Sequence, residues 1–140
     1  MSEVNQTKVL VLGAGAMGCL LGGLLAEGGK NNNGESGLDV TFLDAWEEHI
    51  VAIQKNGMKL SGEGGERVLT VKAVFNDQEG KNVSSLGKFD IIICQTKALH
   101  TKVAVESVKH CFDDNTVCVS FQNGLGNEDI IAEVLQDMGG

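Results

Sequence analysis

The sequence predicts an α/β fold, a doubly wound and mostly parallel sheet with helices on both faces. Short apolar runs alternate with longer segments in which apolar residues recur at helical spacing, and a glycine-rich turn separates the first run from the first helical segment. Strands joined through a helix run parallel, because the crossover returns the chain to the same edge of the sheet. With 140 residues, of which 42% are hydrophobic, the chain is large enough for one domain with its own core.

Each expected element rests on its own pattern. The strands are apolar over most of their length and cover residues 8–12, 39–43, 67–75, 88–94 and 116–121. The helices have apolar residues at helical spacing and cover residues 16–27, 46–55, 98–112 and 127–138. Residues 28–37 form a glycine- and asparagine-rich loop. Two short apolar pieces around SGEGGE indicate a hairpin-like excursion, whose longer strand is the one at 67–75.

The residues of the first and last predicted helices also indicate how each helix is buried or capped. The first helix is apolar nearly all round and should therefore be buried. Gly22 and Gly23 weaken it, but they let its backbone approach the sheet closely. Asn127 is expected to cap the last helix, with acidic residues favourably placed in the first turn.

Charge and composition exclude several classes of partner. The net charge of -8 and the sequence pI near 4.7 argue against nucleic acid and anionic membranes, because both require a basic face. No apolar run approaches the roughly 20 residues of a membrane span. The polar first residues do not form a signal peptide. The four cysteines (Cys19, Cys94, Cys111 and Cys118) have no C-x-x-C spacing, so reduced thiols in a cytoplasmic protein are expected.

The glycine-rich turn has the spacing G-x-G-x-x-G directly between the first strand and the first helix. Gly13 permits a tight turn, Gly15 lets the backbone approach a pyrophosphate, and Gly18 lets helix and strand pack closely. The phosphates would face the free N–H groups at the start of the helix. The motif therefore predicts a dinucleotide site, and the alternative is a glycine-rich turn without a ligand.

An acidic residue at the end of the second strand is the second part of this motif. Asp44 has that position, although it follows Gly13 at more than the usual spacing of about 20 residues, an excess that the loop at 28–37 explains. Its carboxylate would accept hydrogen bonds from the adenosine ribose of NAD and repel the extra phosphate of NADP. Glu47 and Glu48 strengthen this preference. Asp44 could also serve as the N-cap of the helix at 46–55, and the two roles are compatible.

Two further segments follow strands at the edge where open α/β sheets bind ligands. Thr96 and Lys97 follow the strand at 88–94, and Asn123 and Gly124 follow the strand at 116–121. The alternatives are a solvated lysine before a helix and an Asn-Gly turn with left-handed geometry.

The pieces GAGAMG, CQTKA and QNGLGNED, together with IQKNGMKLSGEGG, resemble the N-terminal domain of the ketopantoate reductase (2-dehydropantoate 2-reductase) family over nearly the whole chain. The resemblance implies that residues 1–140 are an NAD(P)-binding Rossmann domain. It also implies that Lys97 reaches the cofactor, and that Asn123 lies near the nicotinamide and binds the substrate. The pyrophosphate would lie on the glycine loop, which consists of Gly13, Ala14, Gly15, Ala16, Met17 and Gly18.

The same resemblance implies an activity, the reduction of a 2-keto acid by hydride transfer, as in the conversion of ketopantoate to pantoate for pantothenate biosynthesis. NADPH is the commoner cofactor in the family, whereas Asp44 favours NADH here. The family's last strands and its helical C-terminal domain, which supplies a general-acid lysine, are expected to be missing. No catalytic residue is therefore assigned to this chain, and it should be inactive alone. Its partners would be the dinucleotide, a small 2-keto acid in the full-length enzyme and, if it oligomerises, a second copy in a homodimer.

Two other functions remain open from the sequence. One is a non-enzymatic NAD(H)-sensing regulatory module, and the other is a different hydroxyacid dehydrogenase of the 6-phosphogluconate dehydrogenase-like group. His49, His100 and His110 have no metal-ligand spacing and are expected on solvated helix faces, so no metal site is predicted. Trp46 could flank the adenine, although a core contact at the helix start is the favoured interpretation.

Overall fold

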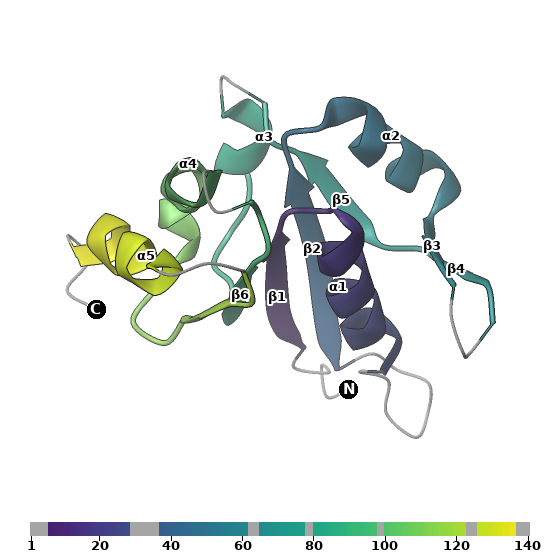
Figure 1. Cartoon of the computed structure of the whole chain (residues 1–140), viewed down its shortest axis with the longest axis horizontal. Helices are drawn as coiled ribbons and strands as arrows, with labels where there is room; N and C mark the ends of the chain where they lie inside the picture. The colour runs from purple at the N-terminus through teal and green to yellow at the C-terminus, as the bar shows by residue number, and fades with distance from the viewer. Residues whose placement is uncertain are drawn as a thin grey trace, which may run out of the picture.

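The chain folds around a five-stranded sheet (Figure 1). The computed structural model describes residues 6–28, 37–61, 65–77, 80–97, 100–122 and 126–136, with only the backbone of residues 16 and 17. The strands are paired in the order β5-β2-β1-β6-β7, and every pair is parallel. Their bounds are β1 (Thr7–Leu12), β2 (Leu38–Asp44), β5 (Lys72–Phe75), β6 (Ile91–Cys94) and β7 (Val117–Ser120). The predicted parallel α/β sheet is confirmed.

Helices cover both faces of this sheet, as expected (Figure 1). One face carries α1 (Ala16–Gly28) and α2 (Glu47–Asn56), and the other carries α3 (Lys81–Ser84), α4 (Thr101–Ser107) and α5 (Asn127–Leu135). Because side chains of a strand alternate between faces, Val9 and Val11 of β1 belong to the core under α1 and α2. Leu10 and Leu12 belong to the core on the opposite face. The sheet is thus buried between two separate apolar layers.

Helix α1 lies very close to the sheet, as its glycines predict. A Cβ atom at Gly22 would be 2.5 Å from the ring of Phe42, which is fully buried. A Cβ atom at Gly23 would be 3.0 Å from the side chain of Leu60. The helix is not buried all round, however, since Leu20 and Leu24 on its outer side are 43% and 45% exposed.

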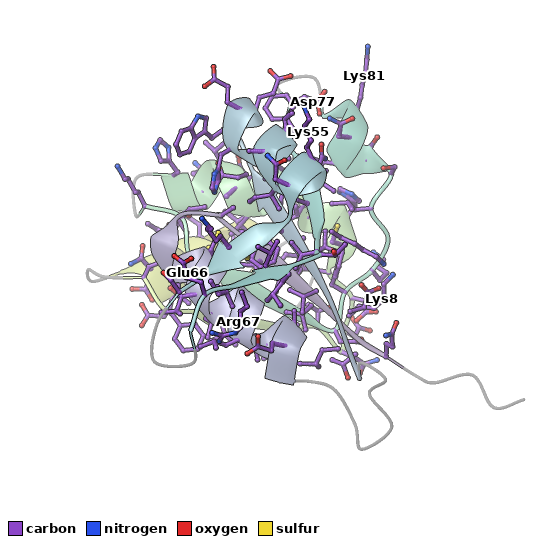
Figure 2. The ribbon with its side chains drawn as sticks, turned by 90° about the vertical axis from the view of Figure 1, so that its right-hand side faces the viewer. Lys8, Lys55, Glu66, Arg67, Asp77 and Lys81 are labelled. Carbon is purple, nitrogen blue, oxygen red and sulfur yellow. The ribbon has the colours of Figure 1, made fainter. Side chains whose placement is uncertain are left out.

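The region between α2 and β6 differs from the expectation. Residues 67–75 form two strands instead of one: β4 (Arg67–Leu69) pairs antiparallel with β3 (Met58–Leu60), and β5 joins the main sheet. The β3–β4 hairpin lies beside α1, where Arg67 forms an ion pair with Glu27 in the last turn of the helix (Figure 2). The predicted excursion is therefore a hairpin that covers α1.

The C-terminal helices also differ in detail. The helix expected at 98–112 is α4 followed by a 3-10 helix (Lys109–Cys111). Asn127 does not cap α5: Gly126 has the N-cap position, and Asn127 is inside the helix with only 2% of its surface exposed. None of the helices in the described ranges is long and apolar enough to cross a bilayer.

All four cysteines are free, as predicted. Burial raises the pKa of Cys111 to about 11 and the pKa of Cys118 to about 12. Both thiols therefore stay protonated at neutral pH. Cys111 is a small buried core residue, and Cys118 is half-buried against the same core.

Candidate dinucleotide-binding site

The glycine-rich turn between β1 and α1 is enclosed by the ends of the neighbouring strands. Gly13 has a φ of +104°, a backbone conformation that residues with a side chain rarely adopt. Its N–H donates to the Leu43 carbonyl at 2.8 Å. A Cβ atom at Gly13 would lie 2.9 Å from the carbonyl group of Gln95, just beyond β6. The turn is therefore closed by backbone on both sides.

The other two glycines of the motif have opposite surroundings. A Cβ atom at Gly18 would lie 2.0 Å from the carbonyl oxygen of Gly13, so only glycine allows α1 to approach the turn this closely. A Cβ atom at Gly15 would meet no atom within 4 Å. Gly15 therefore presents bare backbone to open space, which is the arrangement that a pyrophosphate requires.

The start of α1 adds hydrogen-bond donors to this open backbone. The N–H of Cys19 donates to the Gly15 carbonyl at 2.9 Å. In an α-helix the N–H groups of the preceding residues, 16–18 here, have no acceptor within the helix, and the helix dipole favours an anion beside them. The first turn of α1 contains no acidic residue that would repel such an anion.

Ala14 is held by side chains from three elements, β2, α2 and α1. Its N–H donates to Asp44 Oδ2 at 2.7 Å, at the end of β2. Its carbonyl oxygen lies 2.6 Å from His49 Nε2 on α2, and it accepts a bond from Cys19 Sγ at 3.1 Å. A carbonyl can only accept, so His49 carries its proton on Nε2. Burial, and secondly the Asp44 carboxylate, raise the pKa of the Cys19 thiol, which keeps it a donor.

The Asp44 carboxylate, which is predicted to bind the adenosine ribose, accepts hydrogen bonds from two backbone N–H groups of this chain. Its Oδ1 atom accepts the N–H of Trp46 at 2.8 Å, and its Oδ2 atom accepts the N–H of Ala14. Trp46 has the N-cap position of α2, so Asp44 supports the start of this helix without being its N-cap. A carboxylate offers about four acceptor positions. Two of them face the backbone, which leaves acceptor capacity for hydroxyl groups.

Trp46 and His49 differ from the expectation, and the other two histidines do not. The Trp46 side chain is 61% exposed, so the favoured core contact is wrong. Its ring stacks on that of His49, with centroids 4.9 Å apart and an interplanar angle of 25°. His49 is half-buried and bonds the Ala14 carbonyl, so it does not lie on a solvated face. His110 is exposed, as predicted, and also bonds the Val83 carbonyl. His100 is exposed, as predicted.

The ends of β6 and β7 lie at the same edge of the sheet as the glycine turn. In the strand register, Leu12 pairs with Leu43 and Cys94, and Cys94 pairs with Ser120. Lys97 follows β6 with an exposed side chain, and its carbonyl accepts the N–H of His100 at 2.8 Å. The predicted residues Asn123 and Gly124 lie outside the described residues.

The structure thus brings several of the predicted site residues together at one edge of the sheet, and it adds residues that the sequence analysis did not single out. The glycine loop and Asp44 are hydrogen-bonded to each other, and Lys97 leaves the same edge from a neighbouring strand. His49 was missed, although its position one helical turn after Trp46 places both on one side of α2. Gln122 was also missed. Its amide reaches the loop after β6, where it donates to the Thr96 carbonyl at 2.7 Å.

The chain is similar to reductases across nearly its whole length. The family model described as "Ketopantoate reductase PanE/ApbA" matches residues 9–139. The 2-dehydropantoate 2-reductase of Lactococcus lactis is 32% identical over 89% of this chain and 36% of its own length. That of Pyrococcus horikoshii is 37% identical over 91% of this chain and 36% of its own length. The chain therefore spans little more than a third of the curated relatives that it matches.

Solved structures of similar proteins share the fold. A PanE/ApbA family ketopantoate reductase from Ralstonia eutropha superposes with a TM-score of 0.74 at 27% identity, over 91% of this chain and 38% of that chain. D-mandelate dehydrogenase, solved with NADH and anilino(oxo)acetate, superposes with a TM-score of 0.76 at 27% identity, over 91% of this chain and 37% of that chain.

The opposite surroundings of Gly15 and Gly18 predict opposite responses to one substitution. Gly18→Ala should lower the free energy of unfolding by about 1–3 kcal/mol, because its methyl group would collide with the Gly13 carbonyl. Gly15→Ala should change it by less than about 0.5 kcal/mol, because the methyl group would point into open space. Urea unfolding of both variants tests this, and equal losses would contradict the geometry described above.

Proposed function

The chain belongs to the ketopantoate reductase family, and from this premise we propose that it is the dinucleotide-binding domain of a reductase acting on a 2-keto acid. The observation that carries the proposal is the contrast among the three glycines. Gly13 and Gly18 are closed against backbone, and Gly15 alone of the three opens into free space, at the start of α1 and beside the Asp44 carboxylate. Such a surface fits a diphosphate together with a neighbouring ribose.

The residues of this chain would bind and orient the cofactor. The first-turn N–H groups of α1 would hold the pyrophosphate, and Asp44 would accept hydroxyl groups of the adenosine ribose. The bonds from Ala14 to Asp44 and His49 keep the turn in place before a ligand arrives, so less ordering entropy is lost on binding. The bound nicotinamide dinucleotide supplies the hydride of the reaction.

We propose that the cofactor is NADH rather than NADPH. The extra phosphate of NADPH would lie near the Asp44 carboxylate, with Glu47 and Glu48 exposed in the first turn of α2. Like charges at such distances repel, and the repulsion acts against NADPH alone. D-mandelate dehydrogenase, which has the same fold, was solved with NADH, and this supports the assignment.

The substrate side of the proposal rests on the ends of β6 and β7. We propose that Lys97 reaches the cofactor, and that Asn123 binds the carbonyl or hydroxyl group of the substrate near the nicotinamide. Ketopantoate is the proposed substrate, because the relatives are named for it. The comparisons favour neither the regulatory NAD(H)-sensing module nor a dehydrogenase of another group.

Binding of NADH is measurable through Trp46, the single tryptophan of the chain. Trp46 lies two residues after Asp44, so bound NADH should accept excitation energy from its indole ring. Gly15→Ala should weaken NADH binding by about tenfold or more, because its methyl group would enter the pyrophosphate space. The melting temperature should not change.

The matched control for this prediction is Gly28→Ala, the same change at the other end of α1, where a Cβ atom would also meet nothing within 4 Å. It should bind NADH as the unaltered chain does. Absence of energy transfer in the unaltered chain, or equal affinity in the Gly15→Ala variant, would refute the proposed function.

The cofactor preference is tested by Asp44→Asn. The change removes the negative charge and keeps one acceptor oxygen, so the preference for NADH over NADPH should fall by about tenfold. The ratio of the two affinities is the correct measure, since damage to the turn would weaken both ligands equally. Asp39→Asn, at the other end of β2, removes the same charge and should leave the ratio unchanged. A ratio that does not respond to Asp44→Asn would remove Asp44 from the ribose site.

A further inference from the structure

We infer that Gln122 is a positioning residue, which locks together the two loops that carry the nicotinamide end of the site. It lies two residues after β7, directly before Asn123. Its side chain crosses to the neighbouring loop: Nε2 donates to the Thr96 carbonyl at 2.7 Å and to the Thr101 hydroxyl at 2.6 Å. This inference rests on the proposed function, because it assigns a task within the same site.

The chemistry of the partners determines the orientation of this amide. The Thr96 carbonyl can only accept, so the group beside it must be the NH₂ end of Gln122. The opposite end, Oε1, accepts the hydroxyl proton of Ser120 at 2.9 Å. Each end of the amide therefore has a partner of the matching kind, and both hydrogens of the NH₂ group are used.

The network continues into the core between α4 and α5. Thr101, the first residue of α4, is fully buried, and its hydroxyl donates to Asn127 Oδ1 at 3.4 Å. Asn127 is the first residue of α5 and is 2% exposed. Buried polar groups without partners cost free energy, so this chain of bonds resists any change in the spacing of the two loops.

The two proposed site residues on these loops each directly follow a member of the network in the sequence. Lys97 follows Thr96 directly, and Asn123 follows Gln122 directly. Because β6 and β7 lie on the opposite side of β1 from Asp44, Gln122 acts on the nicotinamide half and not on the adenosine half. A misplacement of about 1 Å at a reacting centre can cost about 10²-fold in rate, so a fixed spacing of these loops has a function beyond stability.

Two ligands that differ only in the nicotinamide separate this role from a structural one. NADH and ADP-ribose carry the same diphosphate charge, and only NADH contacts the nicotinamide half. Gln122→Glu has nearly the same volume but presents a carboxylate to the Thr96 carbonyl. By calorimetry it should weaken NADH binding by about tenfold and ADP-ribose binding by less than about twofold.

A matched control comes from α2. Gln54 Nε2 donates to the Ala73 carbonyl at 2.7 Å, so Gln54→Glu removes the same kind of bond with the same change of charge, over β5. It should leave the ratio of the two affinities unchanged. Gln122→Met, which removes the donor without adding charge, should shift the ratio in the same direction as Gln122→Glu, and it decides the question if the Glu variant does not fold.

The outcomes distinguish this inference from the proposed function. If the unaltered chain binds neither ligand, the proposed function fails and the inference fails with it. If it binds both and the Gln122 variants leave the affinity ratio unchanged, only the inference is overturned. Equal affinities for NADH and ADP-ribose in the unaltered chain would overturn it as well, because the nicotinamide half would then make no contact.

Discussion

The hydrogen bonds of Ala14 are the constraint on which the rest of the site depends. The N–H of Ala14 is bound by Asp44 from β2, and its carbonyl is bound by His49 from α2 and by Cys19 from α1. One residue of the turn therefore connects four elements, since the turn itself leaves β1. This arrangement makes the turn rigid, and rigidity is what lets the open backbone at Gly15 serve as a prepared surface.

The parallel sheet extends this arrangement to the other half of the site. Because β1 is the central strand, the turn that follows it meets the ends of both neighbours: the Gly13 N–H donates to the Leu43 carbonyl, and a Cβ atom at Gly13 would collide with the carbonyl group of Gln95. Beyond Gln95, the hydrogen bonds of Gln122 connect the loop after β6 with the end of β7. Two sets of side-chain bonds to backbone, one on each side of β1, thus hold the loops along a single edge.

Features with a local cause could be predicted from the sequence. The glycine spacing requires only that a strand, a turn and a helix follow one another, and the position of Asp44 follows from where the apolar run of β2 ends. The parallel topology follows from alternating strands and helices. Gly22 in a helix likewise indicated a close approach to the sheet, which its position against Phe42 confirms, whereas Gly23 faces Leu60 of the β3–β4 hairpin.

Features that depend on a distant partner could not be predicted. The run at 67–75 has one continuous pattern, yet its first half pairs with β3 and its second half with β2, a change of partner that alternation does not reveal. Asn127 has the sequence features of a cap, but Thr101, far away in the chain, binds it inside the core. The bonds of His49 to Ala14 and of Gln122 to Thr96 were missed for the same reason, since both partners lie far away in the chain.

The central claim is that one edge of this sheet holds a nicotinamide dinucleotide along its length. Titration of the isotopically labelled chain with NADH, followed by the backbone amide resonances, tests this most directly. The account predicts saturable shifts at Gly13, Gly15 and Gly18, at Asp44, and at Lys97 and Asn123 on the far side of β1. Shifts confined to the opposite edge, at Thr7, Asp90 and Val117, or no shifts at all, would contradict it.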